Sequence, residues 1–395
     1  MDSARRNVAL LSGCQGLLLI NNSVLITVNA IAGYTFATDK TLATLPVTAY
    51  FLGAALTTVP ASFLMKHAGR RAGFMAGAAC AMLGAALCAW AVYVESFWLL
   101  CTGTLALGAY FAAGQHYRFA AADAAPAEFK HKAISLVLAG GVIGGFIGPE
   151  TSKLTNEAFS GHVFLGPYLS LIVFAAFSML ILLWLDIPRL PAAVRAEAGR
   201  PLSAIARQPV FIVAVLSGVV GYGVMNLLMT TTPIAMAGHD HHFSDAAFVI
   251  QWHVVAMFAP SFVTGALIQR FGLMPVMLTG VALNLACVAV ALGGAGVMNF
   301  WLSMVLLGVG WNFMFVGATS LLTETHTPAE RAKVQGVNDA AIFSTLVVSS
   351  LSAGALFSLE GWQAMNIYAV PFLILGGAGI LWLAASRRRS SRPAT

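Results

Sequence analysis

Apolar stretches long enough to cross a lipid bilayer recur along almost the whole chain. A helix needs about 20 mainly apolar residues to span the hydrocarbon core of a membrane, and twelve stretches reach that length. Of the 395 residues, 59% are hydrophobic and 9% are charged, whereas a soluble domain carries roughly a quarter charged residues. The sequence therefore predicts an all-α membrane protein. The expected transmembrane helices cover residues 8–32, 44–65, 73–94, 97–122, 133–153, 164–186, 209–232, 246–268, 274–296, 299–322, 334–358 and 363–385.

The positions of the basic residues predict how these helices are oriented. If the N-terminus is cytoplasmic, only Lys40 and Lys153 fall on the outer side and Arg118 falls within a helix. All other Lys and Arg residues then lie on the cytoplasmic side, which is the known bias of membrane proteins. We therefore expect a multi-pass protein of the bacterial inner membrane with both termini in the cytoplasm. The net charge of +6 comes from scattered clusters and forms no basic stripe, so no nucleic-acid partner is expected. The basic residues on the cytoplasmic side are Arg5, Arg6, Lys66, Arg70, Arg71, Lys130, Lys132, Arg189, Arg195, Arg200, Arg207, Arg270, Arg331, Lys333, Arg387, Arg388, Arg389 and Arg392.

Two sequence echoes indicate an internal duplication. The tripeptide Pro-Ala-Glu begins at Pro126 and again at Pro328, 202 positions later. Gly69 and Gly272 occupy similar turns 203 positions apart. A proline-rich polar stretch falls between the sixth and seventh helices, as a linker would. The predicted organisation is therefore an N-terminal six-helix bundle (1–186), a cytoplasmic linker (187–208) and a C-terminal six-helix bundle (209–395).

The turn after the second helix, SFLMKHAGRR (Ser62 to Arg71), resembles a loop motif of the major facilitator superfamily, Gly-x-x-x-Asp-Arg-x-Gly-Arg-Arg. Gly69, Arg70 and Arg71 match this interhelix motif, while Lys66 stands in place of its acidic residue. The stretch GGVIGGFIGP, which ends at Pro149, resembles the family's glycine-rich helix 5. The resemblance implies two six-helix bundles related by pseudo-two-fold symmetry and transport by alternating access. The sequence shows no nucleophile elbow, phosphate loop or CxxC pair, so no enzyme is expected.

Ionisable side chains at membrane depth are costly and are therefore candidate functional groups. The sequence places His116, Arg118, Glu150 and Asp339 inside or at the ends of predicted helices. In one interpretation Arg118, Asp123 and Asp339 lie near cytoplasmic helix ends and only form ion pairs or extend toward water. In the other, His116 or Asp339 binds a proton whose uptake drives the conformational cycle.

A set of sulfur and imidazole side chains lies in two consecutive helices of the second half. Met225 and Met229 are one helical turn apart, and so are His253 and Met257. The seventh helix runs outward and the eighth returns, so the four side chains are expected at similar depth in the outer half of the bilayer. Thioether and imidazole are soft, neutral ligands that suit Cu(I). The alternative is packing, because methionine fills irregular gaps in apolar cores.

The loop between these helices contains His239, Asp240, His241 and His242. Such a tract can capture a metal ion at the outer face, although imidazole and carboxylate also accept Zn(II) or Cu(II). Short His-rich tracts are also found as simple solvated turns. Both interpretations stay open.

The Met-x-x-x-Met and His-x-x-x-Met pairs resemble those of the CcoA-like copper importers, a bacterial branch of the same superfamily. The resemblance implies that Met225, Met229, His253 and Met257 bind copper and that the protein imports it for cytochrome oxidase assembly. Copper is then a transported substrate, no resident cofactor is expected, and periplasmic or cytoplasmic copper carriers are candidate partners of a monomer in the lipid bilayer. Relatives without these residues transport other substrates, including riboflavin. The alternative function is therefore proton-coupled transport of a small organic molecule such as a drug or riboflavin.

Overall fold

The computed structural model describes residues 3–39, 42, 45–156, 158–159, 161–187 and 199–390. Within these residues it contains eleven helices that are long and apolar enough to cross a membrane, together with one bent helix pair. Counting the pair as one span, the prediction of twelve transmembrane helices is confirmed. Lys40, Arg189, Arg195, Arg392 and most of the predicted linker lie outside the described residues. The helices are α1 (Ser3–Phe36), α2 (Leu45–Ala68), α3 (Arg70–Tyr93), α4 (Phe97–Gln115), α5 (Tyr117–Ala124), η2 (Ala127–Phe129), α6 (Lys130–Ala139), α7 (Val142–Asn156), α8 (Leu165–Leu183), α10 (Leu202–Ala206), α11 (Pro209–Gly238), α12 (Phe243–Phe258), α13 (Ser261–Phe271), α14 (Leu273–Leu292), α15 (Val297–Leu322) and α16 (Arg331–Ser390).

Helices dominate because hydrocarbon offers no partner for an open backbone N–H or C=O group, and a helix satisfies these groups within one segment. Three of the predicted spans are nevertheless broken. The fourth changes direction at His116, between α4 and α5. The eighth bends by 41° between α12 and α13, at Pro260, because proline lacks the N–H that would continue the ladder. The fifth is divided between α6 and α7. The eleventh and twelfth spans form the merged helix α16, which is interrupted between them at Gly361, whose backbone is not helical.

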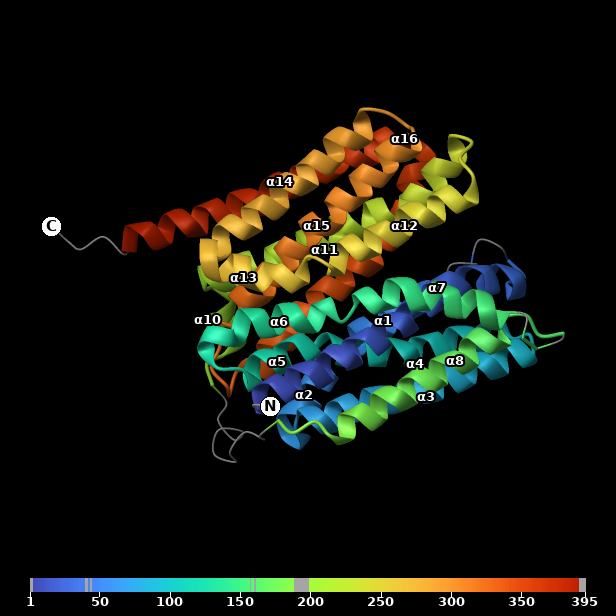
Figure 1. The fold of residues 1–395 in the computed structure, drawn as a ribbon, viewed down its shortest axis with the longest axis horizontal. Coiled ribbons are helices and arrows are strands. Elements are labelled where there is room, and N and C mark those ends of the chain that lie inside the picture. The colour runs from blue at the N-terminus through green and yellow to red at the C-terminus, as the bar shows by residue number, and fades with distance from the viewer. Residues whose placement is uncertain are drawn as a thin grey trace. The chain divides into compact units, whose positions relative to one another are not determined.

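The chain divides into two compact units, and Figure 1 shows each as a set of helices lying side by side. Unit 1 comprises residues 1–199 and 327–347. In it α4 packs against α2 and α3, while α1 packs against α7 and α8. A methyl group added to Gly108 of α4 would lie 2.2 Å from the backbone oxygen of Tyr50 in α2. Glycine therefore allows these two backbones to approach more closely than any other residue would.

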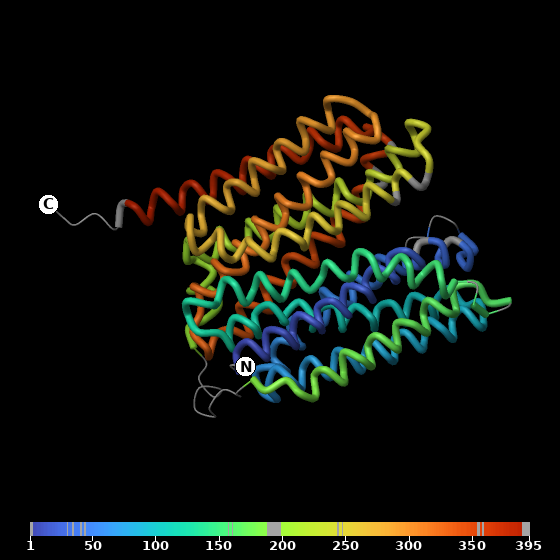
Figure 2. The backbone as a smooth tube through the Cα atoms, viewed as in Figure 1, coloured from blue at the N-terminus to red at the C-terminus, as the bar shows by residue number. Residues whose placement is uncertain are grey.

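Unit 2 comprises residues 200–326 and 348–395. Here α15 packs against α11, α12 and α14. Figure 2 traces the chain through these helices as a continuous tube. A methyl group added to Gly308 of α15 would lie 2.8 Å from the backbone oxygen of His253 in α12. The α12–α15 contact thus repeats the α2–α4 contact of unit 1.

The two glycines of the sequence echo have the same backbone conformation. Gly69 has φ 94° and ψ 160°, and Gly272 has φ 90° and ψ 162°. A side chain is strained at these angles, which explains why glycine occurs at both turns. The structure therefore supports the duplication. The units do not coincide with the predicted halves, however, because residues 327–347 follow α15 in sequence but pack in unit 1. The predicted boundaries at 186 and 209 remain a prediction.

Candidate functional site

Unit 1 contains a set of paired charged side chains that we call the ionic core: Arg70, Arg118 and Asp339, which are buried, and Asp123 and Arg331, whose side chains are 19% and 14% exposed. Arg118 donates from Nη2 to Oδ1 of Asp339 over 2.6 Å, and these side chains are 2% and 1% exposed. Arg118 also donates to Oε1 of Gln115, one turn earlier. Removing charges from water costs several kcal/mol per ion unless they are paired and hydrogen-bonded. The pair explains how both charges can lie inside the bundle.

The other three members of the ionic core share one carboxylate. Arg70 donates to Oδ2 of Asp123 over 2.7 Å, and Arg331 donates to the same oxygen over 2.9 Å. Arg70 also donates to Oε1 of Gln335 over 2.8 Å. These bonds connect α3, α5 and the first turns of α16. Because each partner comes from a different helix, the cluster fixes where residues 327–347 lie against the rest of unit 1.

His116 occupies the break between α4 and α5 and is fully buried. Its ring lies close enough to Arg70 and Arg118 to interact with both electrostatically. The backbone of Thr58 in α2 also interacts with the ring. The structure thus brings His116, Arg118 and Asp339 into one region of unit 1.

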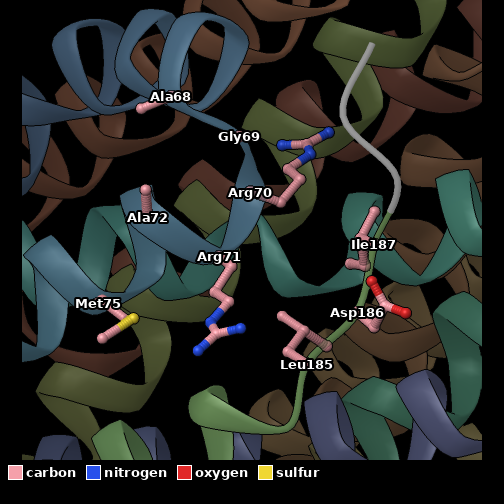
Figure 3. A pocket seen from close by; sticks show the side chains of 9 residues that line it. All are labelled: Ala68, Gly69, Arg70, Arg71, Ala72, Met75, Leu185, Asp186 and Ile187. Atoms are coloured by element: carbon pink, nitrogen blue, oxygen red, sulfur yellow. The ribbon is translucent and has the colours of Figure 1, made fainter.

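The motif residues Arg70 and Arg71 are adjacent but point in opposite directions (Figure 3). Arg70 enters the ionic core, and both arginines line a pocket of about 390 Å³ between the α2–α3 turn and residues 185–187. The pocket also contains Asp186, whose side chain is 83% exposed and lies 4.0 Å from Arg6. Arg71 is exposed at this pocket as well, whereas Leu185 is buried.

Glu150 is not part of the buried set. Its carboxylate accepts a hydrogen bond from Lys153 over 2.7 Å, and both side chains are more than half exposed. The interpretation of Glu150 as a buried coupling group is therefore corrected. It lies on the outer surface of α7, where an exposed ion pair contributes little.

The interior of unit 2 contains an aromatic cluster, defined here as Tyr222, Phe258, Trp311 and Phe315. Trp311 and Phe315 are stacked, with ring centres 4.8 Å apart and planes at 17°. Tyr222 meets both rings edge-on at 5.1 Å, and Phe258 lies 5.6 Å from Trp311. Nε1 of Trp311 is buried without a hydrogen-bond partner in the described residues. Trp311, Phe315 and Phe258 are buried, and Tyr222 is half-buried.

Uncharged polar groups lie near both ends of this cluster. Asn226, one turn after Tyr222 on α11, donates to the hydroxyls of Ser349 and Ser350 over 2.7 and 3.2 Å. On α15, Asn312 donates to the backbone oxygen of Met257 over 2.7 Å. It also bonds to Ser261 and Thr264. Asn312 therefore supplies the partner that the Met257 carbonyl loses where the helix breaks at Pro260.

The four predicted copper ligands lie in the expected helices. Met225, His253 and Met257 are buried, and Met229 is half-buried. His253 uses Nδ1 to donate to the Met304 carbonyl over 2.7 Å, and its Nε2 has no partner among the described residues. Met225 and Met257 form part of the buried apolar core. This arrangement agrees with the alternative interpretation of the methionines as packing residues.

In the His-rich loop between α11 and α12, two histidines bond to separate backbone carbonyls. His239 donates to the Ala235 carbonyl over 2.8 Å, while His241 donates to the Ala295 carbonyl over 2.6 Å. Asp240 and His242 are exposed. Across the described residues, no three His, Cys, Asp or Glu side chains are grouped so that they could hold a metal ion.

Repeated bundles of membrane-crossing helices, with charged groups paired at membrane depth, define a multi-pass membrane transport protein. The chain belongs to the Major Facilitator Superfamily, which it matches over residues 11–259 and 225–395. The riboflavin transporter RfnT of Brucella anthropi is 41% identical over 376 residues, which cover 94% of each chain. YddS of Bacillus subtilis, an uncharacterised transporter of the same type, is 29% identical over 90% of this chain and 86% of its own.

Solved structures show the same fold at low sequence identity. FucP in its outward conformation has a TM-score of 0.78 at 17% identity, with 98% of this chain and 99% of that chain covered. A bacterial homologue of the iron transporter ferroportin has a TM-score of 0.72 at 13% identity, with 96% and 99% covered. FucP is a fucose:proton symporter, so the fold alone does not distinguish an organic substrate from a metal.

The prediction of copper import is wrong. A relative that is similar across 94% of the chain is a riboflavin transporter, and not a copper importer. Sequence reasoning relied on four positions, and methionine at helical spacing is common in apolar cores for packing reasons alone. The assignment of Met225, Met229, His253 and Met257 as copper ligands loses its basis with that function.

Two groups of residues were missed as site candidates. Asp123 and Arg331 complete the ionic core. One Pro-Ala-Glu tripeptide begins three residues after Asp123 and the other begins three residues before Arg331, so this repeat was the available sequence signal for both. The aromatic cluster gave no sequence signal, because its members come from three helices and aromatic residues are frequent in all of them.

Proposed function

We propose that the chain transports riboflavin, or a closely related flavin, across the membrane by alternating access. The observation that carries this proposal is the 41% identity to a riboflavin transporter over 94% of both chains. It corresponds to the organic-molecule alternative that the sequence left open. Riboflavin combines a flat tricyclic ring with a chain of hydroxyl groups, so its site needs aromatic faces beside neutral hydrogen-bonding groups.

The aromatic cluster of unit 2 has this chemistry. Trp311 and Phe315 offer stacked ring surfaces, and Tyr222 is half-buried at the edge of the cluster. Asn226 lies one turn along α11 from Tyr222 and provides a neutral amide beside two serine hydroxyls. We propose that the flavin ring binds against these aromatic side chains and that the sugar-alcohol chain reaches the amide and hydroxyl groups.

The proposal is tested by flavin exchange in liposomes containing the purified protein. Labelled riboflavin should exchange with unlabelled riboflavin, and copper ions should show no saturable uptake. Trp311→Leu should weaken riboflavin binding by about tenfold, because stacking on an aromatic side chain contributes roughly 1–3 kcal/mol and 1.4 kcal/mol is tenfold in affinity. Trp301→Leu on the same helix is the matched control, because Trp301 lies outside the aromatic cluster. A folded wild-type protein that exchanges no riboflavin would disprove the function.

We also propose that the protein lies in the bacterial inner membrane with both termini in the cytoplasm and acts as a monomer without a resident cofactor or catalytic activity. The distribution of Lys and Arg supports the orientation. Reporter fusions at the two termini test it: an enzyme that is active only outside the cytoplasm should stay inactive at both.

A further inference from the structure

The pocket of about 390 Å³ beside the α2–α3 turn combines apolar walls with a charged side chain. Its size is within the range of small-molecule sites, roughly 300–1,000 Å³. Met75, Leu185 and Ile187 supply apolar surface, and Arg71 reaches into the space between Met75 and Leu185 (Figure 3). Arg71 is exposed, and no hydrogen bond or ion pair joins it to another described residue. The pocket therefore contains a guanidinium whose five N–H donors are available to a ligand.

The repeated turn of unit 2 shows that the backbone does not require this arginine. Gly69 and Gly272 have the same conformation, and each precedes a helix that has no side-chain cap. The offset of 203 between these glycines places Met274 where unit 1 has Arg71. Met274 is buried in unit 2, whereas Arg71 is exposed at the pocket. The shared turn geometry therefore leaves the arginine without a structural reason.

The charges around the pocket favour an anionic ligand. The α2–α3 turn, SFLMKHAGRR, contains Lys66, Arg70 and Arg71 but no acidic residue, since Lys66 replaces the acid of the family motif. Among the described residues that line the pocket, the one acidic side chain is Asp186. Its carboxylate is 83% exposed and lies 4.0 Å from Arg6, which offsets its charge. The positive charge of Arg71 therefore remains uncompensated.

The first turn of α3 adds backbone donors to this charge. Residues 70–72 line the pocket, and the first N–H bonded back along the helix is that of Gly73, which donates to the Gly69 carbonyl over 3.2 Å. The N–H groups that precede it have no partner within the helix, and Gly69 has no side chain to cap them. Such groups attract anions. Guanidinium donates two parallel hydrogen bonds to phosphate oxygens, so the combination with Arg71 suits a phosphate group.

The pocket lies where two membrane-crossing helices end. α3 begins at Arg70 and α8 ends at Leu183, and both are long and apolar enough to span a membrane. Trp184, directly after α8, is 65% exposed, and Trp side chains of membrane proteins are enriched at the level of the lipid headgroups. Asn7 of α1 fixes the wall after α8, because it donates to the backbone oxygen of Asp186 over 2.7 Å and accepts from its N–H over 3.3 Å. The pocket is therefore a built feature at headgroup level.

We propose that this pocket binds a phosphate group, with Arg71 and the open N–H groups of α3 as donors and with the apolar walls in contact with the rest of the ligand. An anionic phospholipid and a soluble phosphate share this chemistry. The position at headgroup level and the apolar walls favour the phospholipid. The site is separate from the Arg118–Asp339 pair and from the aromatic cluster, and it goes beyond the proposed transport of riboflavin.

The test measures binding to the purified, delipidated full chain in a neutral detergent and requires no transport. Short-chain phosphatidylglycerol and inorganic phosphate are titrated separately, with phosphatidylcholine of the same chain length as the uncharged reference. Arg71→Gln should weaken binding of the anionic probe by about tenfold, because a charge-assisted partner of the phosphate is lost. Arg270→Gln is the matched control, because Arg270 is an exposed arginine beside the repeated turn of unit 2. It should bind as the wild type does.

Removing the acid of the pocket tests the sign of the ligand's charge. Asp186→Asn should strengthen binding by up to about fivefold, because an exposed like charge is removed. Weaker binding in Asp186→Asn would instead indicate a cationic group on the ligand and would overturn the phosphate assignment.

The two probes distinguish the sources of the phosphate. Binding of phosphatidylglycerol without binding of inorganic phosphate assigns the pocket to a lipid, and saturable binding of inorganic phosphate that Arg71→Gln weakens assigns it to a soluble phosphate. Both outcomes support the site. The proposal is overturned if neither probe binds more tightly than phosphatidylcholine, if Arg71→Gln binds as the wild type does, or if Arg270→Gln weakens binding as much as Arg71→Gln.

Discussion

The two units repeat one packing scheme around interiors of different chemistry. In both, a central helix approaches its neighbour through a glycine, Gly108 in unit 1 and Gly308 in unit 2. Unit 1 then places paired Asp and Arg side chains in its interior. Among the described residues of unit 2, no buried side chain is Asp, Glu, Lys or Arg.

The two units therefore differ in the chemistry of their interiors. An offset of 202 places the uncharged Ser320 where unit 1 has Arg118, and Ser320 is buried too. The duplicated scaffold therefore preserves helix contacts but not interior charge. A charged interior responds to protons and to the loss of a partner, whereas a neutral aromatic interior suits a flat organic ligand.

The largest expected effect comes from breaking the buried ion pair on one side. Arg118→Met leaves Asp339 buried without its arginine and should destabilise the protein by about 3–5 kcal/mol. In the neutral interior of unit 2, Asn312→Leu removes about as many hydrogen bonds as Arg118→Met does in unit 1. It should lower the free energy of unfolding by only about 1–3 kcal/mol. Unfolding in detergent by denaturant measures both. The double substitution Arg118→Met with Asp339→Leu should recover most of the loss, and equal losses for Arg118→Met and Asn312→Leu would remove the distinction between the two interiors.

The fold was accessible from the sequence because its determinants are local. Each span needs only an apolar stretch of sufficient length, and the turn at Gly69 requires a glycine wherever the same backbone recurs, as it does at Gly272. The break in the eighth span was missed, since Pro260 permits either a kink or a helix end. The tertiary partner Asn312 stabilises the bend that is observed.

The site was less accessible because its partners are distant in sequence. Arg118 and Asp339 were both identified as costly intramembrane groups, but a separation of 221 residues gave no sign that they bond to each other. The methionine spacing was misleading for the opposite reason. A pair such as Met225 and Met229 is visible within one helix, yet packing and ligand binding leave the same local pattern.

An intermediate effect is expected at the two glycine contacts. Gly108→Ala would place a methyl group 2.2 Å from the Tyr50 backbone oxygen, while Gly308→Ala would place one 2.8 Å from that of His253. Overpacking costs about 1–3 kcal/mol, so Gly108→Ala should lie near the upper end and Gly308→Ala near the lower. Thermal unfolding in detergent gives the order. If Gly308→Ala lowered the unfolding temperature more than Gly108→Ala, the α2–α4 contact would accommodate an added methyl group more easily than the α12–α15 contact.

The smallest effect is expected for a charge of unit 1 that lies outside its interior. Glu150 bonds to Lys153 at a surface where both side chains are more than half exposed, and such ion pairs contribute at most about 1 kcal/mol. Glu150→Gln should therefore change the free energy of unfolding by less than about 0.5 kcal/mol and leave riboflavin exchange intact. Denaturant unfolding in detergent and riboflavin exchange in liposomes, measured beside Arg118→Met, provide the check. A loss of stability in Glu150→Gln as large as that in Arg118→Met would mean that burial within the ionic core does not determine how much a charge of unit 1 contributes.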